Sequence, residues 1–168
     1  MRADAQRNLD RLLEAAGECF AANGLDTSID EIARRAGVGH GTVFRRFPTK
    51  DALVEAVLTK ELTKLAEVAA DALDDPDPGA GFDRFFRAVA EGYARNRALV
   101  EGVELCRELP PKLALEEAAN RLVREAQKAG TLRDDLTADG IFELVPAASR
   151  FPDVILDGLR PQPQPQPV

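Results

Sequence analysis

The chain has 168 residues, of which 45% are apolar and 30% are charged, and its formal net charge is −7. This composition predicts a globular protein that can bury a core without disulfides or a structural metal. No apolar run is long enough to cross a bilayer, and the charged N-terminus lacks the apolar centre of a secretory signal, so we expect a cytoplasmic protein with no membrane partner.

The chain contains two cysteines, Cys19 and Cys106, and one histidine, His40. Two distant cysteines do not predict a disulfide framework, and Cys19 falls on the apolar side of a helical pattern, where a buried thiol is expected. These residues do not have the spacing of a metal site. The sequence also lacks a Ser/His/Asp order and a phosphate-binding glycine-rich loop. We therefore predict no catalytic residue, no metal, no cofactor and no enzyme activity.

Apolar residues recur with helical spacing along most of the chain, and no stretch alternates with a period of two. The first apolar stripe runs through Leu9, Leu12, Leu13, Ala16 and Phe20. The sequence therefore predicts an all-α fold. The expected helices are 5–22, 28–36, 40–46, 50–73, 81–96, 99–107, 111–129, 136–148 and 151–159.

Several breaks between these helices follow from the chemistry of single residues. In the segment SIDE, Ser28 can cap a helix by accepting a hydrogen bond from the Glu31 N–H, and the Glu31 carboxylate can reach back. The segment DDPDPGAG at 74–81 predicts a linker, because proline cannot continue a helix. For the same reason, Pro146 should kink or end the helix in which it lies.

A basic window lies across two of the short predicted helices. From position 32 to position 50 the charged residues are all basic, namely Arg34, Arg35, Arg45, Arg46 and Lys50. Gly37 follows the first short helix and can adopt the left-handed conformation, while Val43 faces inward from the second. Two short helices around a glycine-containing turn indicate a helix-turn-helix, whose second helix enters the major groove of DNA.

Two functions are compatible with this all-α chain. A DNA-binding regulator needs a surface that meets phosphate, and a window without acids supplies it. The alternative is a non-enzymatic helical module, either a carrier of lipophilic ligands or a scaffold, in which the N-terminal helices only pack. Such a module has no reason to exclude acids from the window, so the sequence favours DNA binding.

The residues that carry a family resemblance are TSIDEIARRAGVGHGTVFRRFPTKDAL, at 27–53. They resemble the N-terminal DNA-binding domain of the tetracycline-repressor (TetR) family in I-A-x-x-A-G-V, in the G-T of a short recognition helix, in an aromatic residue with a basic pair, and in F-P-x-K. The resemblance implies a ligand-responsive homodimeric transcription regulator, most often a repressor. Its implied partners are double-stranded DNA at an inverted repeat, a small-molecule inducer and a second copy of the chain.

The resemblance also implies domains and DNA contacts. The expected domains are a helix-turn-helix domain at 1–48, a helical ligand-binding and dimerisation domain at 49–160 and a disordered Pro/Gln tail at 161–168. Residues expected to contact DNA are Thr27, Ser28, His40, Gly41, Thr42, Phe44, Arg45, Arg46 and Lys50. Phe44 replaces the usual tyrosine and so lacks a phenol that could reach phosphate. Gly39 replaces a frequent serine and so lacks a side-chain helix cap.

Two further sets of residues follow from the family's architecture. An inducer pocket needs apolar walls with a few polar groups, and its candidates are Phe82, Phe85, Phe86, Val89, Tyr93, Val103, Glu104 and Cys106. A dimer surface is expected on the last helices, and its candidates are Ile141, Leu144, Val145, Ile155 and Leu159. The stripe from Phe82 to Tyr93 is most simply core, and the stripe on the last helices is also compatible with packing inside one chain.

Overall fold

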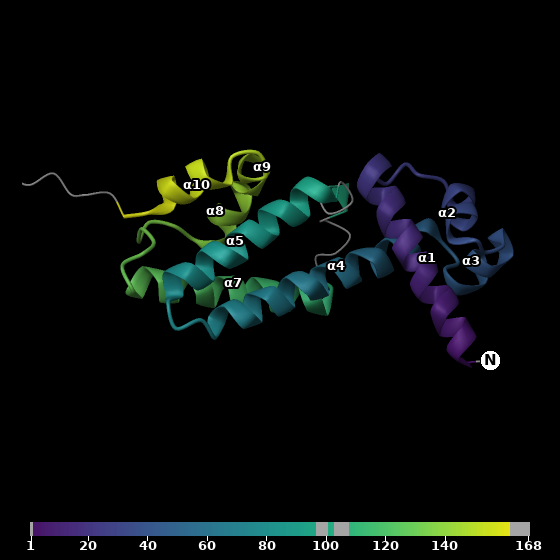
Figure 1. Ribbon diagram of the computed structural model, residues 1–168, viewed down its shortest axis with the longest axis horizontal. Coiled ribbons are helices and arrows are strands. Elements are labelled where there is room, and N and C mark those ends of the chain that lie inside the picture. Colours follow the sequence, from purple (N-terminus) through teal and green to yellow (C-terminus); the bar gives the residue numbers. More distant parts are fainter. Residues whose placement is uncertain (1, 97–100, 103–107, 162–168) are drawn as a thin grey trace, which may run out of the picture. The chain divides into compact units, whose positions relative to one another are not determined.

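The computed structural model describes residues 2–96, 101–102 and 108–161. All regular elements in these residues are helices, which confirms the predicted all-α fold (Figure 1). None of the helices in this part of the chain is both long enough and apolar enough to span a membrane. The chain divides into two compact units, which we call unit 1 (1–62 and 95–112) and unit 2 (63–94 and 113–168).

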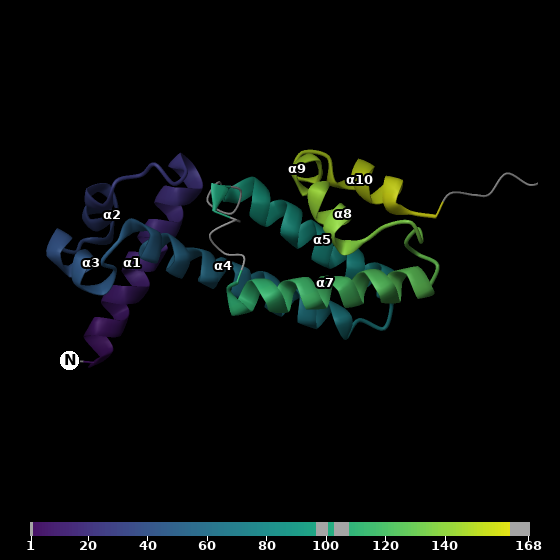
Figure 2. The same ribbon diagram turned by 180° about the vertical axis from the view of Figure 1, so that it is seen from behind.

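Unit 1 contains three helices and the first part of a fourth, namely α1 (Arg2–Asn23), α2 (Ile29–Ala36), α3 (His40–Arg46) and α4 (Lys50–Leu73). Helices α2 and α3 lie side by side next to α1 (Figure 1, Figure 2). The largest fully buried side chains of this unit are Phe20, Ile32, Val43, Leu53, Val54, Val57 and Leu58. Four of them come from α4, so the compact unit extends past residue 48, where the sequence placed the domain boundary.

The single described cysteine lies in the core of unit 1. Cys19 on α1 is only 2% exposed, which confirms that it is a buried side chain. Burial raises the pKa of its thiol, with smaller effects from nearby charges. The side chain therefore stays protonated at neutral pH and acts as a small apolar group in the packing of α1.

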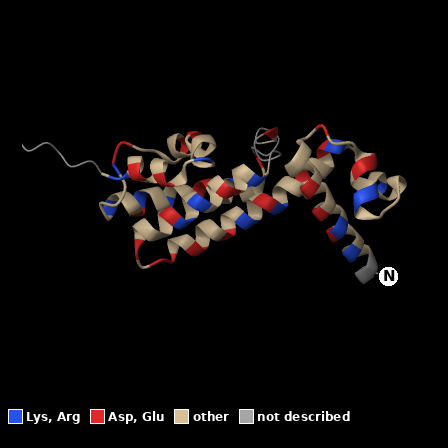
Figure 3. Cartoon of the chain, turned by 45° about the horizontal axis from the view of Figure 1, so that its top comes forward, with Lys and Arg blue, Asp and Glu red and all other residues tan. Residues whose placement is uncertain are grey.

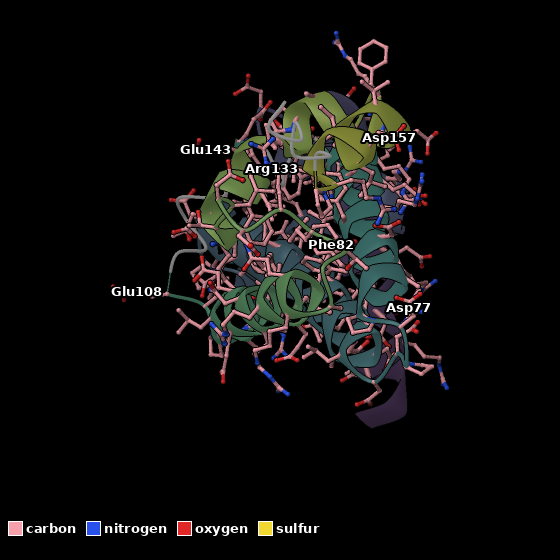
Figure 4. All side chains as sticks on the ribbon, turned by 90° about the vertical axis from the view of Figure 1, so that its left-hand side faces the viewer. Asp77, Phe82, Glu108, Arg133, Glu143 and Asp157 are labelled. Carbon is pink, nitrogen blue, oxygen red and sulfur yellow. The ribbon has the colours of Figure 1, made fainter. Side chains whose placement is uncertain are left out.

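Unit 2 holds the rest of α4, then α5 (Pro78–Arg95), most of α7 (Pro110–Lys128), α8 (Ala138–Glu143), α9 (Val145–Ala148) and α10 (Pro152–Leu159). Aromatic side chains of α5 fill its interior, where Phe82 lies among the surrounding helices (Figure 4). Phe85 meets Phe142 of α8 edge-on, with ring centroids 6.4 Å apart. This aromatic contact packs the short helices against α5.

Two ion pairs also attach α10 to α5. Arg87 Nη2 lies 2.6 Å from Asp153 Oδ1 at the start of α10. Arg160 Nη2 lies 2.5 Å from Asp83 Oδ2 just after its end. Because both arginines are well exposed, each pair contributes little to stability. The two pairs link both ends of α10 to α5.

The connection between α4 and α5 is shorter than the predicted linker. Helix α5 begins at Pro78, three residues before the expected start. The Asp77 carboxylate accepts the N–H of Gly79 at 2.9 Å and of Ala80 at 3.2 Å, so it caps the helix. Proline suits the first helical position, where its missing N–H would have no partner. The proline that predicted a linker therefore starts a helix.

A second aspartate stabilises the same connection. Asp75 accepts the Asp77 N–H at 3.0 Å and Arg84 Nη1 at 2.6 Å. These bonds, the backbone one first, hold the pKa of Asp75 below its ordinary value. The contribution of this carboxylate to stability is therefore present above its unfolded pKa and is lost as the pH falls through its lower folded pKa.

The helix predicted at 136–148 is two helices in the structure. Helix α8 ends at Glu143, and α9 begins at Val145 with Pro146 in its first turn. This confirms that Pro146 interrupts the helix, because its ring cannot follow a preceding helical turn. Most of the helix predicted at 99–107 lies outside the described residues, as does the proline-rich tail.

Candidate nucleic-acid interface

The helix-turn-helix is closed by local hydrogen bonds at both ends of α2. Ser28 Oγ accepts the Glu31 N–H at 3.2 Å, which confirms the predicted N-cap. At the other end Gly37 has a φ of 67°, in the left-handed region, and its N–H donates to the Arg34 carbonyl at 3.2 Å. The turn therefore favours glycine, and it directs the chain from α2 into α3.

Helix α3 has seven residues and buries one of them. Val43 is completely buried against the rest of unit 1. The other six residues are exposed, and they are His40, Gly41, Thr42, Phe44, Arg45 and Arg46. A helix fixed through one side chain presents nearly its whole surface to solvent, and here that surface carries two arginines. A helix of this kind fits the width of the DNA major groove.

Cations and hydroxyls lie at the end of α3 and at the start of α4. Arg45 folds along its own helix, where its Nε donates to the Gly41 carbonyl at 3.2 Å and its Nη2 to Thr42 Oγ1 at 3.3 Å. Lys50 is the first residue of α4, and the Thr49 hydroxyl caps that helix by accepting a backbone N–H at 3.1 Å. Such groups can donate to phosphate oxygens.

A groove of about 580 Å³ adjoins this part of α3. Its lining residues come from the N-terminal half of α1, from the turn and from α3, and they are Ala5, Gln6, Asn8, Leu9, Leu12, Val38, Thr42, Arg45 and Arg46. The amides of Gln6 and Asn8 add hydrogen-bonding groups beside the two guanidinium groups. Sequence reasoning missed both residues, because a polar side chain on the flank of a helix gives no signal of its own.

Thr27, which the sequence predicts to contact DNA, is buried in the turn between α1 and α2. The residue is only 5% exposed. Its hydroxyl faces two carbonyl oxygens, that of Gly24 at 3.1 Å and that of Cys19 at 3.3 Å. The single hydroxyl hydrogen is therefore donated inside the protein, where it closes the turn between α1 and α2. A threonine in a turn readily bonds to nearby carbonyls, and here that local bond wins over exposure.

The basic window of the sequence is not an acid-free surface. Asp30 Oδ1, in the first turn of α2, is hydrogen-bonded to His40 Nδ1 at the start of α3. Arg35 Nη2 lies 2.6 Å from Glu18 Oε2 of α1. Figure 3 shows acidic (red) as well as basic (blue) segments in these helices. Both acids lie before the window in the chain, so only the fold brings them to it.

Two family models match the chain over most of its length. One describes bacterial regulatory proteins of the tetR family and matches residues 12–57, and the other describes the C-terminal domain of SbtR-like transcriptional regulators and matches residues 77–161. A crystal structure of a TetR transcription regulatory protein from Mycobacterium vanbaalenii is 42% identical, with a TM-score of 0.66, and the match covers 95% of this chain and 99% of that one. The chain belongs to the TetR family.

Further relatives are regulators of the same kind. A TetR transcriptional regulator from Streptomyces coelicolor is 28% identical with a TM-score of 0.64, over 92% of this chain and 99% of that one. A helix-turn-helix transcriptional repressor of Mycobacterium tuberculosis strain H37Rv is 42% identical over 97 residues, which are 54% of this chain and 46% of the relative. The match thus spans about half the length of this curated relative. As the resemblance implied, these proteins are transcriptional regulators.

The two departures from the TetR pattern have visible structural results. The ring of Phe44 lies against that of His40, with centroids 4.5 Å apart, so the position of the usual tyrosine is used for ring packing. Gly39 is the N-cap of α3 and makes no side-chain hydrogen bond there. The start of this TetR recognition helix is therefore fixed by contacts of His40 rather than by a capping hydroxyl.

The predicted TetR ligand-pocket residues fall into three groups. Phe82, Phe85, Phe86 and Val89 are buried in unit 2, and the rings of Phe82 and Phe86 stack with centroids 6.0 Å apart. Tyr93 is half-buried. The remaining candidates lie outside the described residues, and they are Val103, Glu104 and Cys106. The apolar stripe of α5 is therefore core, and a ligand would have to insert against it.

The structure also corrects the predicted dimer surface. Three of its candidates, Ile141, Val145 and Leu159, are at most 4% exposed within the single chain, so they pack inside unit 2. The other two, Leu144 and Ile155, are half-buried. The exposed apolar side chains nearby are Phe151 and Val154, at 61% and 68% exposure. The predicted stripe was read correctly as apolar, but most of it faces its own chain.

Proposed function

We propose that this TetR-family chain is a repressor that binds an inverted-repeat operator as a homodimer and leaves it when a small apolar or amphipathic ligand binds. The observation that carries the proposal is the exposed face of α3, on which two arginines accompany a single buried anchor, Val43. Two copies would place their α3 helices in major grooves about 34–36 Å apart. The alternative, a carrier of lipophilic ligands, leaves this face without a role.

Selection from random-sequence DNA tests the proposal. The full chain is mixed with a random duplex pool at about 0.1 M salt, where phosphate contacts still favour binding, and bound DNA is recovered and sequenced. We expect an enriched inverted repeat whose half-sites lie about one helical turn apart, or somewhat more. Enrichment of an isolated half-site would contradict the dimer, and no enrichment at all would contradict operator recognition.

The proposed dimer surface is the outer face of α10. Phe151, Val154 and Ile155 follow helical spacing on this face, while Leu156 and Leu159 are buried on the other. A helix that is apolar on two sides needs a cover on both. A second copy of the chain would supply that cover through the same face, as a two-fold symmetric contact requires.

Replacing Val154 by aspartate is expected to convert the dimer to monomer. The side chain is 68% exposed in the single chain, so the change should leave the fold intact. In the dimer it would bury an unpaired carboxylate, which costs about 3 kcal/mol or more and raises the dimer dissociation constant over about 100-fold. Sedimentation equilibrium at micromolar concentration measures the mass.

The matched control is Leu113→Asp, which places the same charge on an exposed apolar position of α7. This control should remain dimeric, and so should a chain that lacks residues 161–168. A wild-type chain that sediments as a monomer would contradict the proposed dimer. A dimeric Val154→Asp variant would move the interface away from α10.

Release by a ligand needs a route from unit 2 to the DNA-binding helices. Helix α4 runs without proline or glycine from Lys50 to Leu73, and it passes from unit 1 into unit 2 after Leu62. In unit 1, the Glu101 carboxylate accepts the Leu25 N–H at 2.8 Å, in the turn that leads from α1 to α2. A ligand that inserts against the aromatic core of unit 2 would tilt α4 and change the spacing of the recognition helices.

Breaking α4 is expected to abolish this coupling. In the wild type, a ligand should lower DNA affinity by about 5- to 150-fold, and DNA should lower ligand affinity by the same factor. Replacing Thr63 and Lys64 by glycine and proline interrupts the helix. The affinity for DNA alone and the affinity for ligand alone should persist, while the factor by which each ligand lowers the affinity for the other should approach one. Anisotropy titrations of the operator, with and without ligand, measure the coupling factor. An apolar ligand is first identified by its quenching of the fluorescence of Tyr93, the single tyrosine.

The control for this variant replaces Thr63 and Lys64 by two alanines, which keep the helix and should keep the coupling. A folded glycine-proline variant with unchanged coupling would show that the signal does not pass through α4. The hydrogen bond between Glu101 and Leu25 would then be the next route to break.

A further inference from the structure

Three side chains form a cluster at the start of the recognition helix. Asp30 Oδ1 is hydrogen-bonded to His40 Nδ1, and the ring of Phe44, one turn further along α3, lies 4.5 Å from the histidine ring between centroids. The side chains of Asp30 and His40 are 79% and 54% exposed. The cluster is therefore on the surface that we propose to enter DNA, and it is not part of the core.

The contacts of His40 determine which of its ring atoms is free. An ionised carboxylate can only accept a hydrogen bond, so the bond to Asp30 requires the proton on Nδ1. The second ring nitrogen, Nε2, is then left for another partner. Packing against Phe44 restrains the plane of the ring. Together the two neighbours fix both the tautomer and the orientation of the histidine.

We propose that Asp30 is a positioning residue for operator recognition, because it holds His40 so that Nε2 is presented to a base edge in the major groove. The inference rests on the proposed binding of an operator. His40 is the first residue of α3, and the N-terminal residues of a recognition helix are those that contact base edges. With the proton on Nδ1, Nε2 of the neutral ring is an acceptor, so it can accept a hydrogen bond from the amino group of adenine or cytosine.

A merely structural or electrostatic role for Asp30 has different consequences. An exposed ion pair contributes little to folding. A carboxylate near DNA repels phosphate, so its removal alone should strengthen binding to every sequence. If Asp30 positions His40, its removal should strengthen binding to unrelated DNA while it weakens the preference for the operator. These opposite signs separate a positioning role from a simple charge effect.

The first experiment compares binding to the selected operator and to a scrambled duplex. The variants are Asp30→Ala, His40→Ala and the double variant. Asp26→Ala serves as the matched control, because it also removes an exposed acid, one that lies just before α2. We expect each single variant to lower the operator-to-scrambled affinity ratio about 10-fold. The double variant should lose no more than either single variant, and the control should keep the ratio.

The second experiment reads the histidine directly. His40 is the single histidine of the chain, so nitrogen-15 NMR of a chain without a histidine tag reports one imidazole. We expect the proton on Nδ1 in the wild type and in Asp26→Ala, and a shift toward the tautomer protonated on Nε2 in Asp30→Ala. This signal needs no DNA, so it tests the positioning even if an operator is not found.

The outcomes are distinguishable. A wild-type chain that enriches no sequence contradicts the proposed operator recognition, and this inference falls with it. A wild type that enriches an operator, together with an Asp30→Ala variant that keeps both the affinity ratio and the imidazole signals, overturns the role of Asp30 alone. Loss of the ratio in the double variant well beyond either single variant would show that the two residues act separately.

Discussion

Replacing Arg45 and Arg46 together by alanine is expected to lower operator affinity about 60-fold at 0.1 M salt. Both side chains are exposed on α3, and both line the groove beside α1. For each phosphate contact, the slope of log binding constant against log salt concentration is about −0.9. At 0.1 M salt, the loss of two such contacts therefore corresponds to a factor of about 60. The slope of log affinity against log salt should become less steep by about two. Anisotropy titrations from 0.05 to about 0.4 M salt measure both quantities.

The matched control changes the same charge on the neighbouring helix. Arg34 and Arg35 lie at the end of α2, and Arg35 is already paired with Glu18 at 2.6 Å. Their double replacement by alanine should change affinity by less than about threefold and the slope by less than one, because only long-range attraction is lost. Equal losses in the two double variants would mean that net charge, rather than contact by α3, controls binding.

The second large effect is expected from Gly81→Ala, which should destabilise unit 2 by about 3 kcal/mol or more. A methyl group at this position would lie 2.4 Å from the Ala72 carbonyl oxygen and 3.2 Å from Asp75 Cβ. The nearest atom belongs to the backbone, so α4 and α5 would have to move apart, and overpacking of this kind is costly. Urea unfolding followed by the fluorescence of Tyr93 reports on unit 2, because the chain has one tyrosine and no tryptophan.

Gly158→Ala is the control for this substitution. Gly158 lies in α10 and is exposed, and a methyl group there would meet no atom within 4 Å. Alanine should stabilise this helix by about 0.5–1 kcal/mol, because glycine loses more backbone entropy on folding. A Gly81→Ala variant as stable as the wild type would contradict the close approach of α4 and α5.

Local chemistry predicted much of the fold. Ser28, Gly37 and Pro146 act within their own segments, and each capped or ended a helix as expected. The start of α5 was missed, because proline was taken only as a break. At that point the Asp77 cap makes Pro78 a first helical residue. The extent of unit 1 depends on which side chains of α4 find partners, and spacing along the chain does not give that.

The sequence predicted those parts of the site in which one buried residue determines which face of a helix is exposed. It did not predict the contacts between side chains of two different helices. Val43 faces inward, so the exposed side of α3 followed directly from the sequence. The hydrogen bond between Asp30 and His40 joins two helices, and no sequence pattern predicts it. Apolar spacing predicted an apolar stripe on each of the last helices. It did not reveal that Ile141 packs inside the chain whereas Val154 faces outward.

Hydrogen exchange with and without the selected operator tests the central claim most directly, which is that the exposed face of α3 contacts DNA. Helix α3 is short and buries a single side chain, so its amides should exchange quickly in the free protein. Mass spectrometry of peptides that cover 37–50 should show slower exchange when DNA is bound, with Ser28 at the edge of the protected region. Unchanged exchange across 37–50 at saturating DNA would contradict the claim.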